Sequence, residues 1–333
     1  MRLRIVLIML VLLAIGSATA FAGSSTRIGT AGATELLIPV GSRGTAMGGA
    51  ITANTEGVES VFWNPAGLAS LQGTEAMFMH LPYLASIDVN FAGVATAIEG
   101  FGTLAATAKI VSIGNIEETT DAFSEGTGNV YSPTLAVIGL TYARTLTANV
   151  QFGVTGMLVT ENIFQVKATG AAFDVGVIYD PRWKGFRFGI AIKNYGPNMT
   201  FSGEGFDQAI EGVSGPVASH AADFELPGYV SMGVAYDLYN RGSNLVTLAG
   251  NYRSNNFSED MQQFGAEYSF DQRYFLRAGY VTSTQDNFMF GATLGAGLTV
   301  PLGSSKLSFE YSWRDTRAVG LSDNHFFTLR ADF

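Results

Sequence analysis

Residues 305–315 read Ser-Lys-Leu-Ser-Phe-Glu-Tyr-Ser-Trp-Arg-Asp and alternate strictly between apolar or aromatic and polar side chains. Successive side chains of an extended strand point to opposite faces. One face therefore carries Leu307, Phe309, Tyr311 and Trp313, and the other carries Ser308, Glu310, Ser312 and Arg314. The pattern recurs at 274–280. It is typical of a strand with lipid on one side and a polar lumen on the other.

Similar period-two segments follow one another from about residue 75 onward, with Gly, Asn, Asp or Pro at the breaks. Most have the roughly 9–11 residues that a tilted strand needs to cross a bilayer. Hairpin-like connections throughout favour a barrel over a sandwich. The segments predict 14 strands, near residues 75–81, 87–98, 102–113, 134–145, 149–160, 168–180, 186–196, 228–239, 245–254, 261–270, 273–282, 288–299, 305–315 and 324–333.

Composition supports a chain embedded in lipid. Of the 333 residues 47% are hydrophobic and 14% are charged, whereas soluble domains carry about 25% charged residues. After residue 22 no apolar run is long enough for a membrane helix, so the remaining solution is a closed barrel that pairs every backbone group. The expected fold class is all-β: a 14-stranded antiparallel transmembrane β-barrel with a short N-terminal helical or irregular plug.

The two ends of the chain indicate export to a bacterial outer membrane. Arg2 and Arg4 precede an apolar run and the small-residue site at 20–22, which predicts a cleaved signal peptide over residues 1–22. An uncleaved anchor helix is the alternative, but the apolar run is short for it. The last strand alternates to a terminal aromatic, as in the C-terminal signal that the barrel assembly machinery reads, through Phe327, Leu329, Ala331 and Phe333.

Loop lengths predict the orientation. The long connections 114–133 and 197–227 both follow odd-numbered strands, whereas the connections after even-numbered strands are short. Outer-membrane barrels have short periplasmic turns and longer extracellular loops, so both termini should be periplasmic. The loop at 197–227 is rich in Gly, Ser and acidic residues and predicts an exposed excursion.

Residues 23–74 do not alternate and form the expected plug, ahead of a barrel over 75–333. Short helices are plausible around 42–50 and 58–69. The motif residues of this segment are Gly41, Arg43, Gly44, Met47, Gly48, Gly49, Trp63, Asn64, Pro65, Ala66 and Gly67. With this glycine-rich element and the Trp-Asn-Pro-Ala turn, the segment resembles the N-terminal signature of the PorV/PorQ family, which is similar to the FadL family. The resemblance implies a 14-stranded barrel with a hatch.

Catalytic and metal sites lack the necessary residues. The three histidines, His80, His220 and His325, have no partner at a recognisable spacing. The absence of Cys excludes disulfides and thiolate ligands, no cofactor is expected, and the net charge of -9 argues against nucleic acid. The acids of loop 114–133 predict either a cation site or a solvated face. The expected lumen charges are Asp174, Arg187, Lys193, Asp237, Arg253, Glu267, Arg273, Arg277, Glu310, Arg314 and Arg330.

Three function classes remain open. The PorV/PorQ resemblance implies an accessory barrel of type IX secretion, with secreted cargo proteins or secretion components as partners beside outer-membrane lipid. The FadL resemblance implies uptake of a hydrophobic ligand, such as a fatty acid or hydrocarbon, past a movable hatch and through a lateral opening. The third class is a structural or general pore protein. No enzymatic activity is expected.

Overall fold

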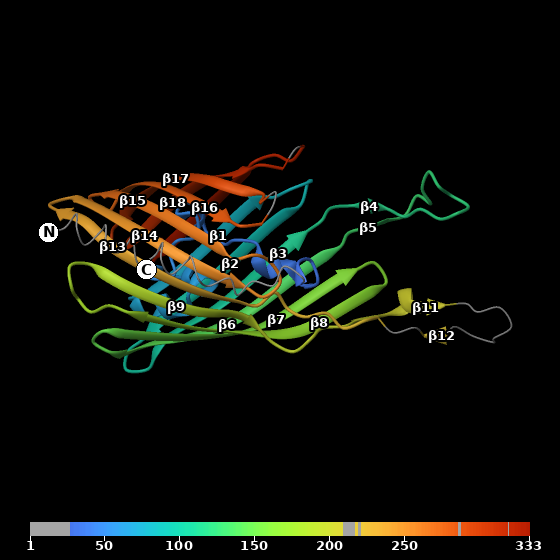
Figure 1. Cartoon of the computed structure of the whole chain (residues 1–333), viewed down its shortest axis with the longest axis horizontal. Coiled ribbons are helices and arrows are strands. Elements are labelled where there is room, and N and C mark those ends of the chain that lie inside the picture. The colour runs from blue at the N-terminus through green and yellow to red at the C-terminus, as the bar shows by residue number, and fades with distance from the viewer. Residues whose placement is uncertain (1–26, 209–216, 219–220, 286–287, 319) are drawn as a thin grey trace.

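A computed structural model describes residues 27–208, 217–218, 221–285, 288–318 and 320–333. They form a 15-stranded antiparallel sheet, of which the two-residue strand β10 is an addition to the edge of β8. The other 14 strands form a closed ring, because β1 pairs with β19 and β8 pairs with β9 (Figure 1). The predicted fold class is therefore confirmed. The predicted signal peptide lies outside the described residues.

Each strand of the ring pairs with its neighbours in the chain. The strand ends fall within three residues of those predicted from the alternation. The ring consists of β1 (Thr74–Pro82), β2 (Asp88–Ile98), β3 (Gly102–Ser112), β6 (Thr134–Thr147), β7 (Val150–Ile163), β8 (Val166–Tyr179), β9 (Phe186–Tyr195), β13 (Tyr229–Arg241), β14 (Asn244–Asn255), β15 (Met261–Phe270), β16 (Tyr274–Ser283), β17 (Phe290–Leu302), β18 (Ser305–Thr316) and β19 (Asn324–Asp332).

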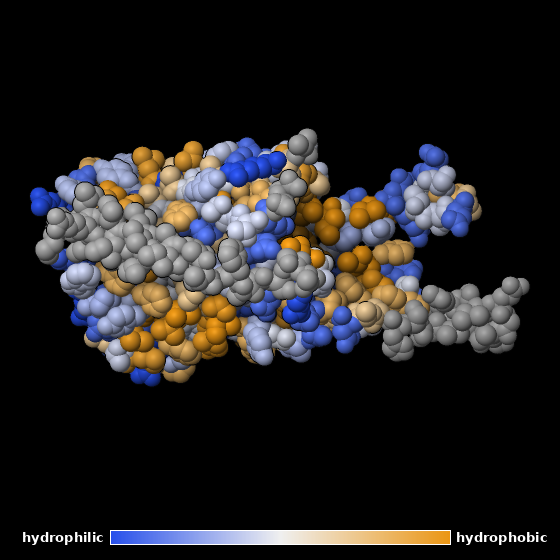
Figure 2. Space-filling model, in the orientation of Figure 1, coloured by the Kyte–Doolittle hydropathy of each residue, from blue (hydrophilic) through white to orange (hydrophobic). Residues whose placement is uncertain are grey.

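The exterior of the ring is apolar, as the alternation predicted. Leu140, Leu276 and Phe309 are 68%, 61% and 51% exposed, and apolar side chains spread over the barrel wall in Figure 2. No helix of the described residues is long and apolar enough to cross a membrane. An exposed apolar belt of this kind is suited to lipid.

The two long connections leave the barrel at the same end, as loop parity predicted. The first carries the hairpin of β4 (Ile116–Glu117) and β5 (Val130–Tyr131), and the second carries η4 (Glu204–Phe206) and the pair β11 (Asp207–Gln208) and β12 (Val217–Ala218). Both project to the right in Figure 1, and the short turns lie at the opposite end. We call these the loop end and the turn end of the barrel.

Residues 27–73 are called the inner segment, and most of its stretch 33–68 is buried inside the ring. They contain η2 (Thr34–Leu37), α2 (Ser42–Ala46), α3 (Ser60–Trp63) and η3 (Pro65–Ser70), so the two predicted helical stretches are present but shorter than expected. Helix α2 contacts β16 to β19, whereas η3 contacts β3 and β6 to β8 on the other side of the barrel. The inner segment therefore fills the lumen from wall to wall.

Candidate functional site

Glycines on the inward face of the wall form the seat of the inner segment. A Cβ at Gly153 of β7 would lie 2.3 Å from the carbonyl carbon of Pro65, and one at Gly279 of β16 would lie 2.2 Å from the nitrogen of Gly48. No side chain fits at such positions, because two backbones approach each other there. The strand register places these glycines in facing pairs, namely Gly153 with Gly176, Gly189 with Gly233, and Gly265 with Gly279.

Asn64 is the main polar tie between the inner segment and the wall. It is completely buried, and its Oδ1 accepts a hydrogen bond from the nitrogen of Ala66 at 3.1 Å, which caps η3 behind Pro65. Its Nδ2 donates to the carbonyl oxygens of Thr52 (2.8 Å), Val177 on β8 (3.2 Å) and Ile190 on β9 (3.4 Å). One amide therefore holds the turn together and anchors it to two strands.

The glycine-rich element sits against the opposite wall. The nitrogen and hydroxyl of Ser42, at the start of α2, hydrogen-bond Thr328 of β19 at 3.1 and 2.8 Å. Gly41, Gly48 and Gly49 have φ values of 86°, 65° and 81°, which side chains rarely adopt. The other motif residues, Gly44, Met47, Trp63, Ala66 and Gly67, pack within the inner segment or against the wall.

A network of buried ion pairs joins the inner segment to β15, β16, β18 and β19. Arg43 binds both carboxylate oxygens of Glu267, at 2.9 and 3.2 Å, and Arg277 binds Glu267 at 2.6 Å. Arg277 and Arg330 both contact Glu310, at 3.1 and 3.3 Å. Three of the predicted lumen charges, Glu267, Arg277 and Glu310, therefore belong to one network with Arg43 of the inner segment.

Glu59 closes this network from within the inner segment. Its Oε2 accepts from Arg330 at 3.2 Å and its Oε1 accepts from the nitrogen of Gly44 at 2.7 Å. Burial and the nearby Glu310 raise the pKa of Glu59 to about 7, although Arg330 opposes the shift. Three arginines and their carboxylates thus clamp both helices of the inner segment to the wall.

A second polar cluster fixes the side that faces β3, β8 and β9. Lys109 donates to the carbonyl oxygen of Ile38 at 3.2 Å, and Lys193 donates to that of Val61 at 3.0 Å. Lys193 also pairs with Asp174 of β8 at 2.5 Å. Both ammonium groups flank the ring of Phe62. The inner segment is therefore held by charge on both sides and by glycine contacts between them.

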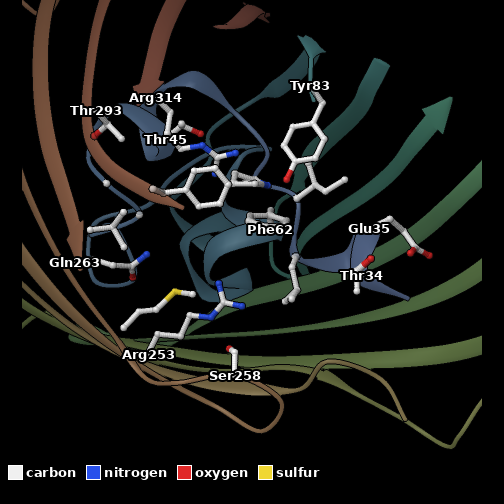
Figure 3. A pocket seen from close by; sticks show the side chains of 18 of the residues that line it. Thr34, Glu35, Thr45, Phe62, Tyr83, Arg253, Ser258, Gln263, Thr293 and Arg314 are labelled. Atoms are coloured by element: carbon white, nitrogen blue, oxygen red, sulfur yellow. The ribbon is translucent and has the colours of Figure 1, made fainter. Parts of the chain in front are cut away.

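A cavity of about 460 Å³ lies between the inner segment and the loop end. Its floor includes η2, Phe62 and Trp63, and its wall includes Tyr83 and Phe290 (Figure 3). Most of the lining surface is apolar. The cavity can therefore hold a small apolar molecule on the loop side of the inner segment.

Two arginines face this cavity, and Figure 3 shows their guanidinium groups turned toward it from opposite sides. Arg253 donates to the Asn255 amide oxygen at 2.8 Å, and its guanidinium lies 3.5 Å from the ring centroid of Tyr229. Arg314 donates to the Asn324 amide oxygen at 2.6 Å and lies over a phenylalanine ring at 3.8 Å. No carboxylate of the described residues pairs with either group. Arg314 is 6% exposed and Arg253 is half-buried. A cation removed from water without an anion is costly, which makes the pair a candidate anion-binding site.

The wall is interrupted between β8 and β9. Their register shifts between Phe173 and Val175, and Asn194 turns into the left-handed region at φ 56°. Beyond this point β8 keeps its pairing with β7, but on its other edge β9 is absent and only the two residues of β10 pair there. Met199, Phe224 and Leu226 fill the gap from the legs of the second excursion. The expectation of an exposed excursion was therefore wrong for these legs, because Met199 and Leu226 are buried in an apolar cluster with the wall.

Sequence reasoning identified some lumen residues and missed others. Arg273 is not in the lumen, since its side chain is 52% exposed beside Asp271 in a tight turn at the turn end. Glu35 and Lys109 are buried inside and were missed, as was the glycine seat. The glycine seat had a signal in the sequence. Some inward positions of the strands carry Gly where neighbouring inward positions carry charged residues. His80 contacts Asn90, His325 contacts Tyr311, and His220 lies outside the described residues.

One acid of the first loop, Glu118, is hydrogen-bonded within the hairpin. Glu118 accepts from Thr127 at 2.8 Å and from Asn129 at 2.9 Å, and these hydrogen bonds lower the pKa of Glu118. No group of three or more His, Cys, Asp or Glu side chains in the described part of the chain is placed to hold a metal ion.

Comparison with solved structures gives the fold family. The match to the CymD monoaromatic hydrocarbon channel covers 89% of this chain and 98% of the CymD chain, with a TM-score of 0.56 and 13% sequence identity. The match to the Pseudomonas putida toluene transporter TodX covers 88% of this chain and 96% of the TodX chain, with a TM-score of 0.56 and 13% sequence identity. The match to a Pseudomonas aeruginosa FadL homologue covers 88% of this chain and 98% of the homologue, with a TM-score of 0.51 and 14% sequence identity.

The fold is that of the FadL-type barrels. No family model matches the chain, and no curated protein matches its sequence. The PorV/PorQ resemblance therefore rests on the motif residues of the inner segment alone.

Proposed function

We propose that the protein is an outer-membrane channel that takes up hydrophobic small molecules and is gated by the inner segment, which acts as its plug. The observation that carries this proposal is the apolar cavity between the inner segment and the loop end. The names of the structural neighbours, a toluene transporter and a monoaromatic hydrocarbon channel, support the same class. Loop parity supports an extracellular loop end and periplasmic termini.

Two features of the structure give the ligand a route: the discontinuity between β8 and β9, and the inner segment that fills the lumen. A ligand enters the cavity from the loop end and rests above the inner segment. The discontinuity between β8 and β9 offers a lateral path into lipid when Met199, Phe224 and Leu226 move aside. Movement of the inner segment offers the path to the turn end. An apolar molecule favours either path over open water, because its surface stays out of solvent.

The two arginines favour ligands that carry a carboxylate. An apolar body would contact Phe62, Tyr83 and Phe290, while the head would neutralise Arg253 or Arg314. Charge-assisted hydrogen bonds are about twice as strong as neutral ones. The cavity should therefore prefer a hydrophobic acid to a hydrocarbon of the same size.

Flux into proteoliposomes tests the proposal with labelled laurate and labelled toluene. The double variant R253Q/R314Q should transport laurate about tenfold or more slowly, because each lost charged contact is worth about 1.5–3 kcal/mol. Toluene flux should be unchanged. Arg273→Gln, in an exposed turn, is the matched control. No transport of either compound by the wild type would disprove uptake, and equal laurate flux in the double variant would remove the role of the arginines.

The plug function needs its own test. Deleting residues 24–72 should leave a folded barrel that still shifts on a gel after heating, because the strands satisfy their own hydrogen bonds. Permeability to small antibiotics should rise in cells that carry this variant. A barrel that assembles and stays as tight as the wild type would show that the inner segment is not a plug.

An accessory role in type IX secretion is the second candidate. It is supported by the motif over residues 41–69 and by the two excursions, 114–133 and 197–227, which carry four and five acidic residues and no Lys or Arg. Such a surface suits contact with a basic exported protein. Comparing the secreted proteins of a deletion strain with its uptake of laurate separates the two functions. A changed set of secreted proteins with unchanged uptake would favour secretion.

A further inference from the structure

One carboxyl group of the inner segment has no hydrogen-bond donor. Glu35, in η2, is 1% exposed, and no N–H or O–H of the described residues donates to either of its oxygens. The residue lies on the border of the cavity (Figure 3). An ionised carboxylate in this position would lose its hydration without replacement. The site is therefore built for a carboxyl group that holds a proton.

The partner of that proton is on the wall. The carboxyl group of Glu35 is close to that of Glu161 on β7, which is 6% exposed. Two ionised carboxylates this close repel each other strongly away from water. A carboxylic acid beside a carboxylate instead forms a short, strong hydrogen bond.

The other charges around the pair do not replace the proton. Lys109 of β3 is near Glu35, but its ammonium donates to the carbonyl oxygen of Ile38. Beyond it, Lys193 and Asp174 of β9 and β8 pair with each other. On the side of the second excursion, Glu225 pairs with Arg27 at 2.6 Å. Lys193, Asp174 and Glu225 therefore each have an ionic partner, whereas Lys109 is held by a main-chain carbonyl and forms no salt bridge with Glu35 among the described residues.

We propose that Glu35 and Glu161 share one proton, and that this proton holds the first turn of the inner segment against β7. Loss of the proton leaves two carboxylates facing each other and releases residues 27–38 from the wall. The same stretch is linked to the filler of the β8–β9 gap, because Gly32 donates to the carbonyl oxygen of Glu225 at 3.1 Å. The proton site stands by itself, whereas its meaning as a control of uptake rests on the proposed function.

The sign of the pH dependence follows from the seated state. Burial and the neighbouring Glu161 raise the pKa of Glu35 from 4.5 to about 7. A released Glu35 in water returns to its ordinary value, so the seated state binds the extra proton. Release should therefore increase as the pH rises from 4.5 to about 7 and level off above it. The released fraction should grow by about tenfold per pH unit within this window, because one proton is lost.

Thiol labelling can measure the release without any substrate, since the chain contains no Cys. Leu36 is 3% exposed beside Glu35, and Thr30 is exposed. The labelling rate of Leu36→Cys by a maleimide, divided by that of Thr30→Cys, reports release and cancels the pH dependence of the thiol itself. The ratio should rise across the window in the otherwise wild-type protein.

Glu35→Gln is the deciding variant. Its amide keeps a donor for Glu161 and cannot lose a proton, so the ratio should stay low and flat with pH. Glu161→Gln should do the same and serves if the first variant does not fold, as judged by the gel shift on heating. A flat ratio in the wild type, or an unchanged rise in both variants, would overturn the proposal. A rise abolished by both variants in a protein that transports nothing would leave the proton site standing and disprove uptake alone.

Discussion

The glycine seat predicts that a single methyl group can loosen the inner segment without touching the barrel wall. A Cβ at Gly153 would lie 2.3 Å from both the carbonyl carbon and the oxygen of Pro65, and 2.6 Å from the nitrogen of Ala66. All three are main-chain atoms, so no side chain can rotate away. Ordinary van der Waals contact begins at 3.4 Å, and the inner segment must retreat by about 1 Å.

This retreat sets the size of the effect. Overpacking a filled interior costs about 1–3 kcal/mol. Here the strain is present only while the inner segment is seated, so it shifts the equilibrium toward release. A shift of about 1–3 kcal/mol changes a population by roughly 5- to 150-fold. The strand ladder of β7 should be unaffected, because alanine keeps every backbone hydrogen bond.

Gly156 provides a matched control on the same strand. It points to the outside, where an added Cβ would be 3.8 Å from the ring of Phe173, an ordinary contact. Gly153→Ala should raise ion conductance in planar bilayers and sensitivity to large antibiotics in cells, whereas Gly156→Ala should leave both unchanged. Both variants should shift on a gel like the wild type. If Gly153→Ala is as tight as the wild type, or if Gly156→Ala leaks equally, the seat does not hold the inner segment.

Three further predictions concern the anchor, the lipid face and the orientation. Asn64→Ala removes the amide that donates to three carbonyl oxygens. It should destabilise the seated state by about 1–3 kcal/mol and raise conductance. Wild-type conductance would contradict the anchor role. Leu276 is 61% exposed on the outer wall, and Leu276→Arg should lower the free energy of unfolding in lipid by about 2–4 kcal/mol. A loss no larger than that of Leu276→Ala would mean that this face does not meet lipid. A cysteine at Ala122 should react with an impermeant maleimide in intact cells, and one at Thr147 only after the outer membrane is opened; the reverse result would invert the barrel.

Much of the fold could be read from local patterns. The alternation over 305–315 assigns an outer and an inner face without any knowledge of the neighbouring strands, because the side-chain period of a strand is two. Gly, Asn, Asp and Pro at the breaks set the strand ends to within three residues. The turn at Asn64 and Pro65 was likewise visible, since its cap and its fixed φ are properties of adjacent residues.

The site was less accessible to the same reasoning. The sequence placed Glu267, Arg277 and Glu310 on the inward face, but it could not show that Arg43, which precedes Glu267 by 224 residues, completes their network. Arg273 was misplaced, because alternation continues into a turn without marking where the lumen ends. Glu35 lies in a segment without a period, so no pattern indicated that it would be buried.

By itself, the sequence determined a closed 14-stranded barrel, the faces of its strands and the common end of its long loops, because these depend on spacings of two residues and on loop lengths. Only the tertiary structure decided which inward residues meet the inner segment, where the wall opens between β8 and β9, and which arginines pair with no carboxylate of the described residues. The physical reason is that these features depend on strand register around a closed ring. Ring closure brings Ser42 to within 3.1 Å of Thr328, 286 residues away, and no local pattern encodes that distance.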